Sequence, residues 1–153
     1  MSNDFWLEGK TAALSLTFDD ARLSQVVRAF LCLMLMGSRQ LFMSSIQPMQ
    51  QRLSEWKQAL ENGHEIGNHT FNHPCSGNFS FSRNRALEDY TLERMKNEII
   101  EANAAIEQAL GITPKTFAYP CGQKFVGRAQ GVKSYVPLVA QHFLVGRDAF
   151  NEV

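Results

Sequence analysis

Residues 50–74 read QQRLSEWKQALENGHEIGNHTFNHP, and the fold class follows from the pattern of this stretch. Apolar side chains recur at helical spacing over residues 50–62, and Gly63 is a natural stop, so a helix is predicted there. The four residues HEIG at 64–67 predict a short strand directly after it. A helix that leads straight into a strand is typical of the repeating unit of an α/β fold.

The same alternation extends to both sides of this unit. Within residues 10–18, Leu14, Leu16 and Phe18 alternate with polar residues, which predicts a strand. Residues 91–110 carry the clearest amphipathic helix, ended by Gly111. Two more short strands are expected over residues 116–119 and 142–145. Strands that alternate with helices favour a parallel α/β arrangement.

The composition limits the classes of function. The chain has 153 residues, which suggests a single domain over residues 1–153. The 15 basic residues balance the 15 acidic ones, which argues against a nucleic-acid partner. The apolar run at 26–36 is too short for a membrane span, and residues 1–9 lack the apolar core of a signal peptide, so a cytoplasmic location is the default expectation. The three cysteines imply no disulfide framework.

Two acidic residues, Asp19 and Asp20, follow the first predicted strand. Successive side chains of a strand point in different directions, so one carboxylate could bind a hard metal ion while the other stays free as a base. The alternative is that the pair forms a turn or caps a helix.

Two histidines, His69 and His73, stand four residues apart. One turn of helix would bring both imidazoles to the same face. Together with one carboxylate they would leave coordination positions open, as in catalytic metal sites. The alternative is that both are ordinary surface or core residues. His64, on the predicted strand, is interpreted as structural.

A third motif lies at residues 116–122, TFAYPCG. A strand that ends in Pro-x-Gly makes a tight turn whose backbone N–H groups can point into a cleft. By itself this is also an ordinary strand exit.

The three motifs, in this order, resemble the polysaccharide deacetylase family, also known as the NodB homology domain or carbohydrate esterase family 4. The resemblance implies a distorted, incomplete (β/α) barrel and removal of acetyl groups from N- or O-acetylated carbohydrate polymers, by hydrolysis of non-peptide carbon–nitrogen bonds in the N-acetylated case. It implies a divalent cation, with Zn as first guess and Co, Ni, Mn or Fe as alternatives. It assigns the catalytic base to Asp19, the metal ligands to Asp20, His69 and His73, and the oxyanion or substrate contacts to Tyr119, Pro120, Cys121 and Gly122.

The sequence also departs from the family. The Leu-x-His motif that supplies the general acid has no match, and His142 is not assigned to that role, so a C-terminally truncated domain is expected. Ala118 stands where many members carry an arginine that orients the base, and Ala21 replaces the usual glycine. Residues 27–48 show neither helical nor strand periodicity. A buried helix is one interpretation of them. The other is a two-nucleotide frame shift, which would restore the family's strand.

These departures keep two alternatives to the enzyme open. One is a catalytically impaired remnant that still binds carbohydrate or metal, and the other is a fragment that does not fold. If residues 27–48 are out of frame, the neighbouring strands are expected to lose their ladder partners. Cys75, which follows His73 closely, could approach the metal, although a plain buried thiol is the simpler expectation. The oligomeric state is left open.

Overall fold

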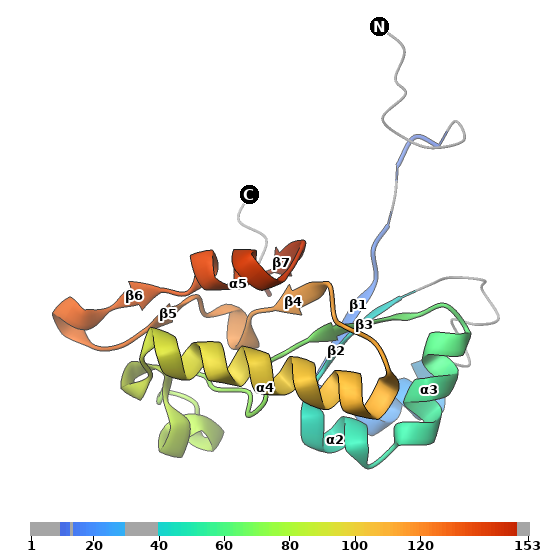
Figure 1. Ribbon diagram of the computed structural model, residues 1–153, viewed down its shortest axis with the longest axis horizontal. Helices are drawn as coiled ribbons and strands as arrows, with labels where there is room; N and C mark the ends of the chain where they lie inside the picture. The colour runs from blue at the N-terminus through green and yellow to red at the C-terminus, as the bar shows by residue number, and fades with distance from the viewer. Residues whose placement is uncertain (1–9, 13, 30–39, 150–153) are drawn as a thin grey trace, which may run out of the picture.

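The computed structural model describes residues 10–12, 14–29 and 40–149 (Figure 1). Its centre is a curled sheet of five parallel strands in the order β1-β2-β3-β4-β7, which forms a half-barrel with its helices. The predicted α/β class and incomplete barrel are therefore confirmed. The strands are β1 (Thr17–Asp19), β2 (Leu41–Ser44), β3 (Glu65–Asn68), β4 (Thr116–Ala118) and β7 (Val145–Arg147).

Helices pack around this sheet, and the long helix α4 runs across the middle of the molecule in Figure 1. None of the helices in the described part of the chain has the length and apolar character needed to cross a membrane. The regular helices are α2 (Ile46–Gln50), α3 (Leu53–Glu61), α4 (Leu92–Leu110) and α5 (Val136–His142). The shorter elements are η2 (Gln25–Ala29), η3 (Ser80–Arg85), η4 (Leu87–Asp89), η5 (Pro120–Gly122), η6 (Ala129–Gly131), β5 (Phe125–Val126) and β6 (Lys133–Ser134).

The long helix α4 confirms the sequence prediction at both ends. The hydroxyl of Thr91 accepts a hydrogen bond from the backbone N–H of Arg94, which caps the first turn. Gly111 ends the helix in the left-handed conformation, with φ of 71°. Its buried face joins two cores: Ile106 packs with α2, α3 and β2, and Ile99 packs with β4 and α5.

Strand β2 contradicts the buried-helix interpretation over residues 41–44 and the expectation that the neighbouring strands lose their ladder partners, whereas the frame shift stays a prediction about the coding sequence. Residues 41–44 are neither helical nor unpaired, because β2 pairs in parallel with β1 on one side and β3 on the other. Phe42 and Met43 are fully buried. Ladder hydrogen bonds use backbone groups that nearly every residue has, and the apolar side chains of LFM fill the space beside the sheet. Residues 30–39 of the same stretch lie outside the described residues.

Two predicted strands also need correction. The strand over 10–18 is confined to β1, which begins at Thr17, and Leu14 is exposed. The strand over 142–145 is wrong: His142 ends α5, and β7 starts at Val145. Tertiary packing overrides the local pattern here, because Val139 of α5 is buried in the second core.

Candidate metal centre

The two histidines lie in the loop after β3, and their imidazoles meet. The Nε2 atoms of His69 and His73 are 3.1 Å apart. One turn of helix was expected here, but the loop is irregular. Thr70 and His73 have positive φ angles of 64° and 52°. The two imidazoles do lie together, but a kinked loop brings them there and not the expected turn of helix.

A buried asparagine holds this loop in place. The amide nitrogen of Asn68 donates to Ile99 O and to Asn103 Oδ1 of α4, at 3.0 and 2.8 Å. Its carbonyl oxygen accepts a 2.7 Å hydrogen bond from the backbone N–H of Thr70. The hydroxyl of Thr70 in turn accepts from the backbone N–H of His73, at 3.1 Å. The loop is therefore tied to the long helix through a chain of hydrogen bonds.

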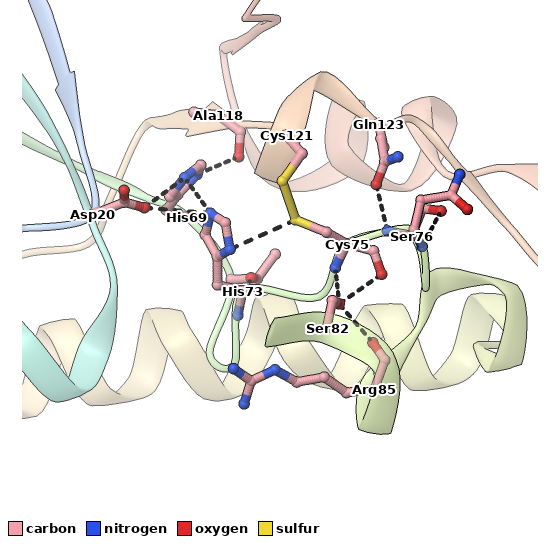
Figure 2. Close-up of a disulfide and its surroundings, with 12 residues drawn as sticks. Asp20, His69, His73, Cys75, Ser76, Ser82, Arg85, Ala118, Cys121 and Gln123 are labelled. Carbon is pink, nitrogen blue, oxygen red and sulfur yellow. Dashed lines mark hydrogen bonds and ion pairs between the residues drawn. A yellow bond between two sulfur atoms is a disulfide. The ribbon is translucent and has the colours of Figure 1, made fainter. Parts of the chain in front are cut away.

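Asp20 reaches the same point from the end of β1. Its Oδ1 lies 3.3 Å from His73 Nε2 and 3.7 Å from His69 Nε2. Arg22 donates to the other oxygen, Oδ2, through Nη2 at 2.9 Å and Nε at 3.2 Å. Figure 2 shows Asp20 and the two imidazoles directed toward one another.

The donor set fits a divalent cation. Ligand atoms at about 2.1 Å from a tetrahedral cation lie about 3.4 Å from one another, close to the separations among Asp20, His69 and His73. His69 Nδ1 lies 2.9 Å from Ala118 O, which can only accept, so this nitrogen carries the proton and Nε2 keeps its lone pair. Burial lowers the pKa of both histidines, against the opposing effect of Asp20, and keeps them neutral.

Asp19, the last residue of β1, faces a different partner. Arg147 on β7 donates to Asp19 Oδ1 through Nη2. In the ladder between β4 and β7, Arg147 lies directly beside Ala118. Position 118, where many family members carry an arginine, is an alanine here, and an arginine on the neighbouring strand contacts Asp19.

The turn after β4 forms η5. Gly122 and Gln123 donate their backbone N–H groups back to Tyr119 O and Pro120 O. Cys121 has φ of 54°, and within the described residues its N–H donates to no protein acceptor. The backbone N–H of Tyr119 donates to Arg147 O and its ring is buried in the second core, so an oxyanion or substrate contact of Tyr119 stays a prediction for its hydroxyl.

A disulfide joins the two loops of the site. Cys75 follows the histidine loop, and Cys121 lies in η5, 46 residues later; their sulfurs are bonded (Figure 2). The expectation that Cys75 is a plain buried thiol is wrong, because the fold brings together two sulfurs that are distant in sequence. Beyond the bond, Ser76 N donates to Gln123 Oε1 at 2.7 Å.

A pocket of about 480 Å³ opens beside Ser76 and Gln123. Gly122 and Gln123 line it from the η5 turn, Glu88 from η4 and Phe125 from β5. The carboxylate of Glu88 accepts from Ser76 Oγ and from the backbone N–H of Gly77, which lower its pKa. The pocket therefore combines an exposed aromatic ring with ionised and amide groups.

The model of the polysaccharide deacetylase family matches residues 8–135. The chain belongs to the polysaccharide deacetylase family. A curated relative, the uncharacterized protein YlxY of Bacillus subtilis (strain 168), is 36% identical over 66 residues, which are 43% of this chain and 17% of YlxY.

Two solved structures share the fold of this chain. A family 4 carbohydrate esterase from Streptomyces lividans, in complex with acetate, shares 26% identity with a TM-score of 0.60, over 74% of this chain and 53% of the esterase. A carbohydrate esterase family 4 pseudoenzyme from Bacillus anthracis shares 18% identity with a TM-score of 0.63, over 86% of this chain and 41% of the pseudoenzyme. At 18% identity the likeness concerns the fold alone. The chain thus spans about half or less of the length of the proteins it matches.

The structure brings Asp19, Asp20, His69 and His73 to one edge of the sheet, as the sequence predicts. It adds Asn68 and Arg147, which sequence reasoning missed. Asn68 had no signal of its own. The signal for Arg147 was the alanine at 118, where an orienting arginine was expected, together with an arginine on the last strand.

Proposed function

We propose that this polysaccharide deacetylase family member is a metal-dependent hydrolase, with Zn as the preferred ion, that removes acetyl groups from N-acetylated or O-acetylated carbohydrate polymers. The observation that carries the proposal is the convergence of Asp20, His69 and His73 beside a second, separately held carboxylate, Asp19. Two imidazoles and one carboxylate suit Zn and leave positions open for water and substrate.

The cation would be held by Asp20 Oδ1 and by the Nε2 atoms of His69 and His73. When bound, such a cation lowers the pKa of water and polarises a carbonyl oxygen. Since both histidines are neutral, their lone pairs are available for it at neutral pH.

Asp19 is the proposed general base. It takes a proton from water, and the resulting hydroxide attacks the acetyl carbon. Arg147 acts as a positioning residue, because its hydrogen bond holds the carboxylate of Asp19 in one orientation. The free N–H of Cys121 is the proposed donor to the oxyanion, and losing one such donor typically costs about 3 kcal/mol.

The pocket beside η5 is the proposed place for the sugar chain. It begins at Gly122, next to the proposed oxyanion donor, and its exposed Phe125 offers a ring on which a sugar can stack. Glu88 and Gln123 supply polar partners for hydroxyl groups.

A second candidate, the impaired carbohydrate- or metal-binding remnant, is favoured by one observation. A departing amine needs a proton from a general acid. His142 lines a pocket together with Lys115, which directly precedes β4. His142 therefore lies near the amino end of β4, whereas the site lies at the carboxyl ends of the strands. The described residues therefore contain no third histidine near the proposed centre.

Acetate release from N-acetylglucosamine oligomers, with Zn supplied, separates the two candidates. We expect the wild type to release acetate and Asp19→Asn to lose at least 100-fold of that activity, since the base is removed. We also expect purified wild type to retain one metal ion and His69→Ala to lose it. Metal retention without acetate release would support the remnant, and equal metal content in both proteins would contradict the centre itself.

A further inference from the structure

His73 lies between two different groups of possible ligands. Its Nε2 faces Asp20 and His69, whereas its Nδ1 lies 3.7 Å from the sulfur of Cys75 (Figure 2). The sulfur of Cys121 is bonded to that of Cys75, so both sulfurs are on the Nδ1 side. Nε2 of this imidazole thus faces a carboxylate and a second imidazole, and Nδ1 faces a pair of sulfur atoms.

We propose that Cys75 and Cys121, once reduced, form with His73 a second metal site that takes a thiophilic cation such as Zn²⁺, and that this site competes with the first for His73. The competition, though not the sulfur site, rests on the proposed function. A dithiol supplies the two electrons and the two protons and itself becomes a disulfide. Alternatively, a phosphine supplies the two electrons and becomes an oxide, while water provides the oxygen of the oxide and the two protons of the thiols. On binding, the cation displaces the two thiol protons.

The geometry of the pair supports a shared cation. Ligand atoms of His73, Cys75 and Cys121 all lie within 4.8 Å of one another. Two thiolates on a tetrahedral cation stand about 3.8 Å apart. The Cα atoms are 6.2 Å apart, so rotation about the side-chain bonds can open the sulfurs to that separation without moving the backbone. Cys75 is fully buried, which protects a thiolate–metal bond from water.

Competition follows from the chemistry of the imidazole. A neutral imidazole has one nitrogen with a lone pair and one with a proton. If a cation binds Nδ1 of His73 beside the sulfurs, Nε2 carries the proton and has no lone pair for the site with Asp20 and His69. While the disulfide is intact, the sulfurs are not thiolate ligands, and Nε2 is available. The oxidation state of the pair therefore selects which site His73 serves.

Cobalt(II) binding to the full chain tests the proposal, because thiolate ligands give cobalt an intense near-ultraviolet charge-transfer band that oxygen and nitrogen ligands do not. The protein is titrated without oxygen, either oxidised or after reduction by a phosphine that is then removed. We expect the band only in the reduced protein, with one cobalt per chain in both states.

Substitutions locate the band. Cys75→Ser and Cys121→Ser should each reduce its intensity by at least half and weaken cobalt binding at least 10-fold, whereas Cys32→Ser, the control, should leave it unchanged. A reduced protein without the band, a band of undiminished intensity in Cys75→Ser, or two cobalt ions per reduced chain would overturn the proposal.

The same titration distinguishes the sulfur site from the proposed deacetylase centre. If Asp20→Asn abolishes cobalt binding in the oxidised protein and leaves the band of the reduced protein intact, both sites are supported. If oxidised wild type binds no cobalt while the reduced protein shows the band, the proposed deacetylase centre fails and the sulfur site stands. Circular dichroism of each variant shows that the comparison is made on folded protein.

Discussion

The two halves of the candidate metal centre are built differently. The histidine half, the loop after β3, is anchored in the interior: His69 is 2% exposed and Asn68 ties the loop to α4, while the side chain of His73 is 23% exposed. The carboxylate half, at the end of β1, is more open. The side chain of Asp20 is 31% exposed, Arg22 contacts Asp20, and Arg147 contacts Asp19. Burying a neutral imidazole is much cheaper than burying a carboxylate, so the charged ligands stay near water while the neutral ones form the rigid wall.

The largest effect is expected in the histidine half. Asn68→Ala removes two hydrogen bonds to α4 and leaves the backbone N–H of Thr70 without an acceptor. We expect a loss of about 2–4 kcal/mol in the free energy of unfolding, because a buried polar group is left unsatisfied. Metal affinity should fall roughly 10–100-fold, as for other supports of metal ligands. Urea denaturation and metal titration measure the two quantities.

Asn103→Ala is the matched control for Asn68. It removes only one of these hydrogen bonds, so its loss in the free energy of unfolding should be about 1 kcal/mol. Equal losses in the free energy of unfolding for Asn68→Ala and Asn103→Ala would show that the loop does not depend on Asn68. The proposed difference between the histidine half and the carboxylate half would then be wrong.

In the open half we expect an effect on activity with little effect on stability. Arg147→Met frees the carboxylate of Asp19, and a misplaced base costs roughly 100-fold in kcat. The free energy of unfolding should change by less than about 1 kcal/mol, as for other partly exposed ion pairs. Steady-state kinetics and urea denaturation check both parts.

Arg22→Met tests the neighbouring carboxylate in the same way. The side chain of Arg22 is 71% exposed, and it contacts the oxygen of Asp20 that faces away from the histidines. We expect less than about a threefold change in kcat. If Arg22→Met were as damaging as Arg147→Met, the loss would reflect charge alone and not the orientation of Asp19.

The pH dependence of the metal-free protein sharpens the contrast further. Burial lowers the pKa of His69 below its usual 6.5, so the unfolded chain binds more protons than the folded one just below that pH. The stabilisation is complete above pH 6.5 and decreases as the pH falls toward the folded-state value. Over the first pH unit below 6.5, the contribution of His69 is at most about 1.4 kcal/mol.

His69→Gln isolates this contribution. Its free energy of unfolding, measured in urea between pH 7.5 and 5.5 with a chelator present, should fall less steeply than that of the wild type. An unchanged slope would mean that the imidazole is not held in its neutral form.

The smallest effect is expected at Ala21, where the open loop has φ of 51° and the methyl group is buried in the first core. Ala21→Gly relieves backbone strain of about 1 kcal/mol and loses a methyl contact worth about 0.8 kcal/mol. The two effects nearly cancel, so the free energy of unfolding should change by less than about 0.5 kcal/mol.

Gly111→Ala is the control for Ala21→Gly. It adds a methyl group that contacts nothing within 4 Å, at φ of 71°, so no packing compensates the strain. We expect a loss of about 1 kcal/mol by urea denaturation. A clearly stabilising Ala21→Gly would show that the methyl group adds nothing to the core.

The sequence by itself determined the α/β class, the long helix α4 with its stop at Gly111, and the residues that form the histidine and aspartate motifs. These signals are local: periodicity and turn chemistry act within a few residues. Only the tertiary structure decided that residues 41–44 form a paired strand, that Arg147 reaches Asp19 and that Cys75 bonds to Cys121. These contacts join residues that are distant in the chain, and the three-dimensional packing that brings them together has no signature in either segment alone.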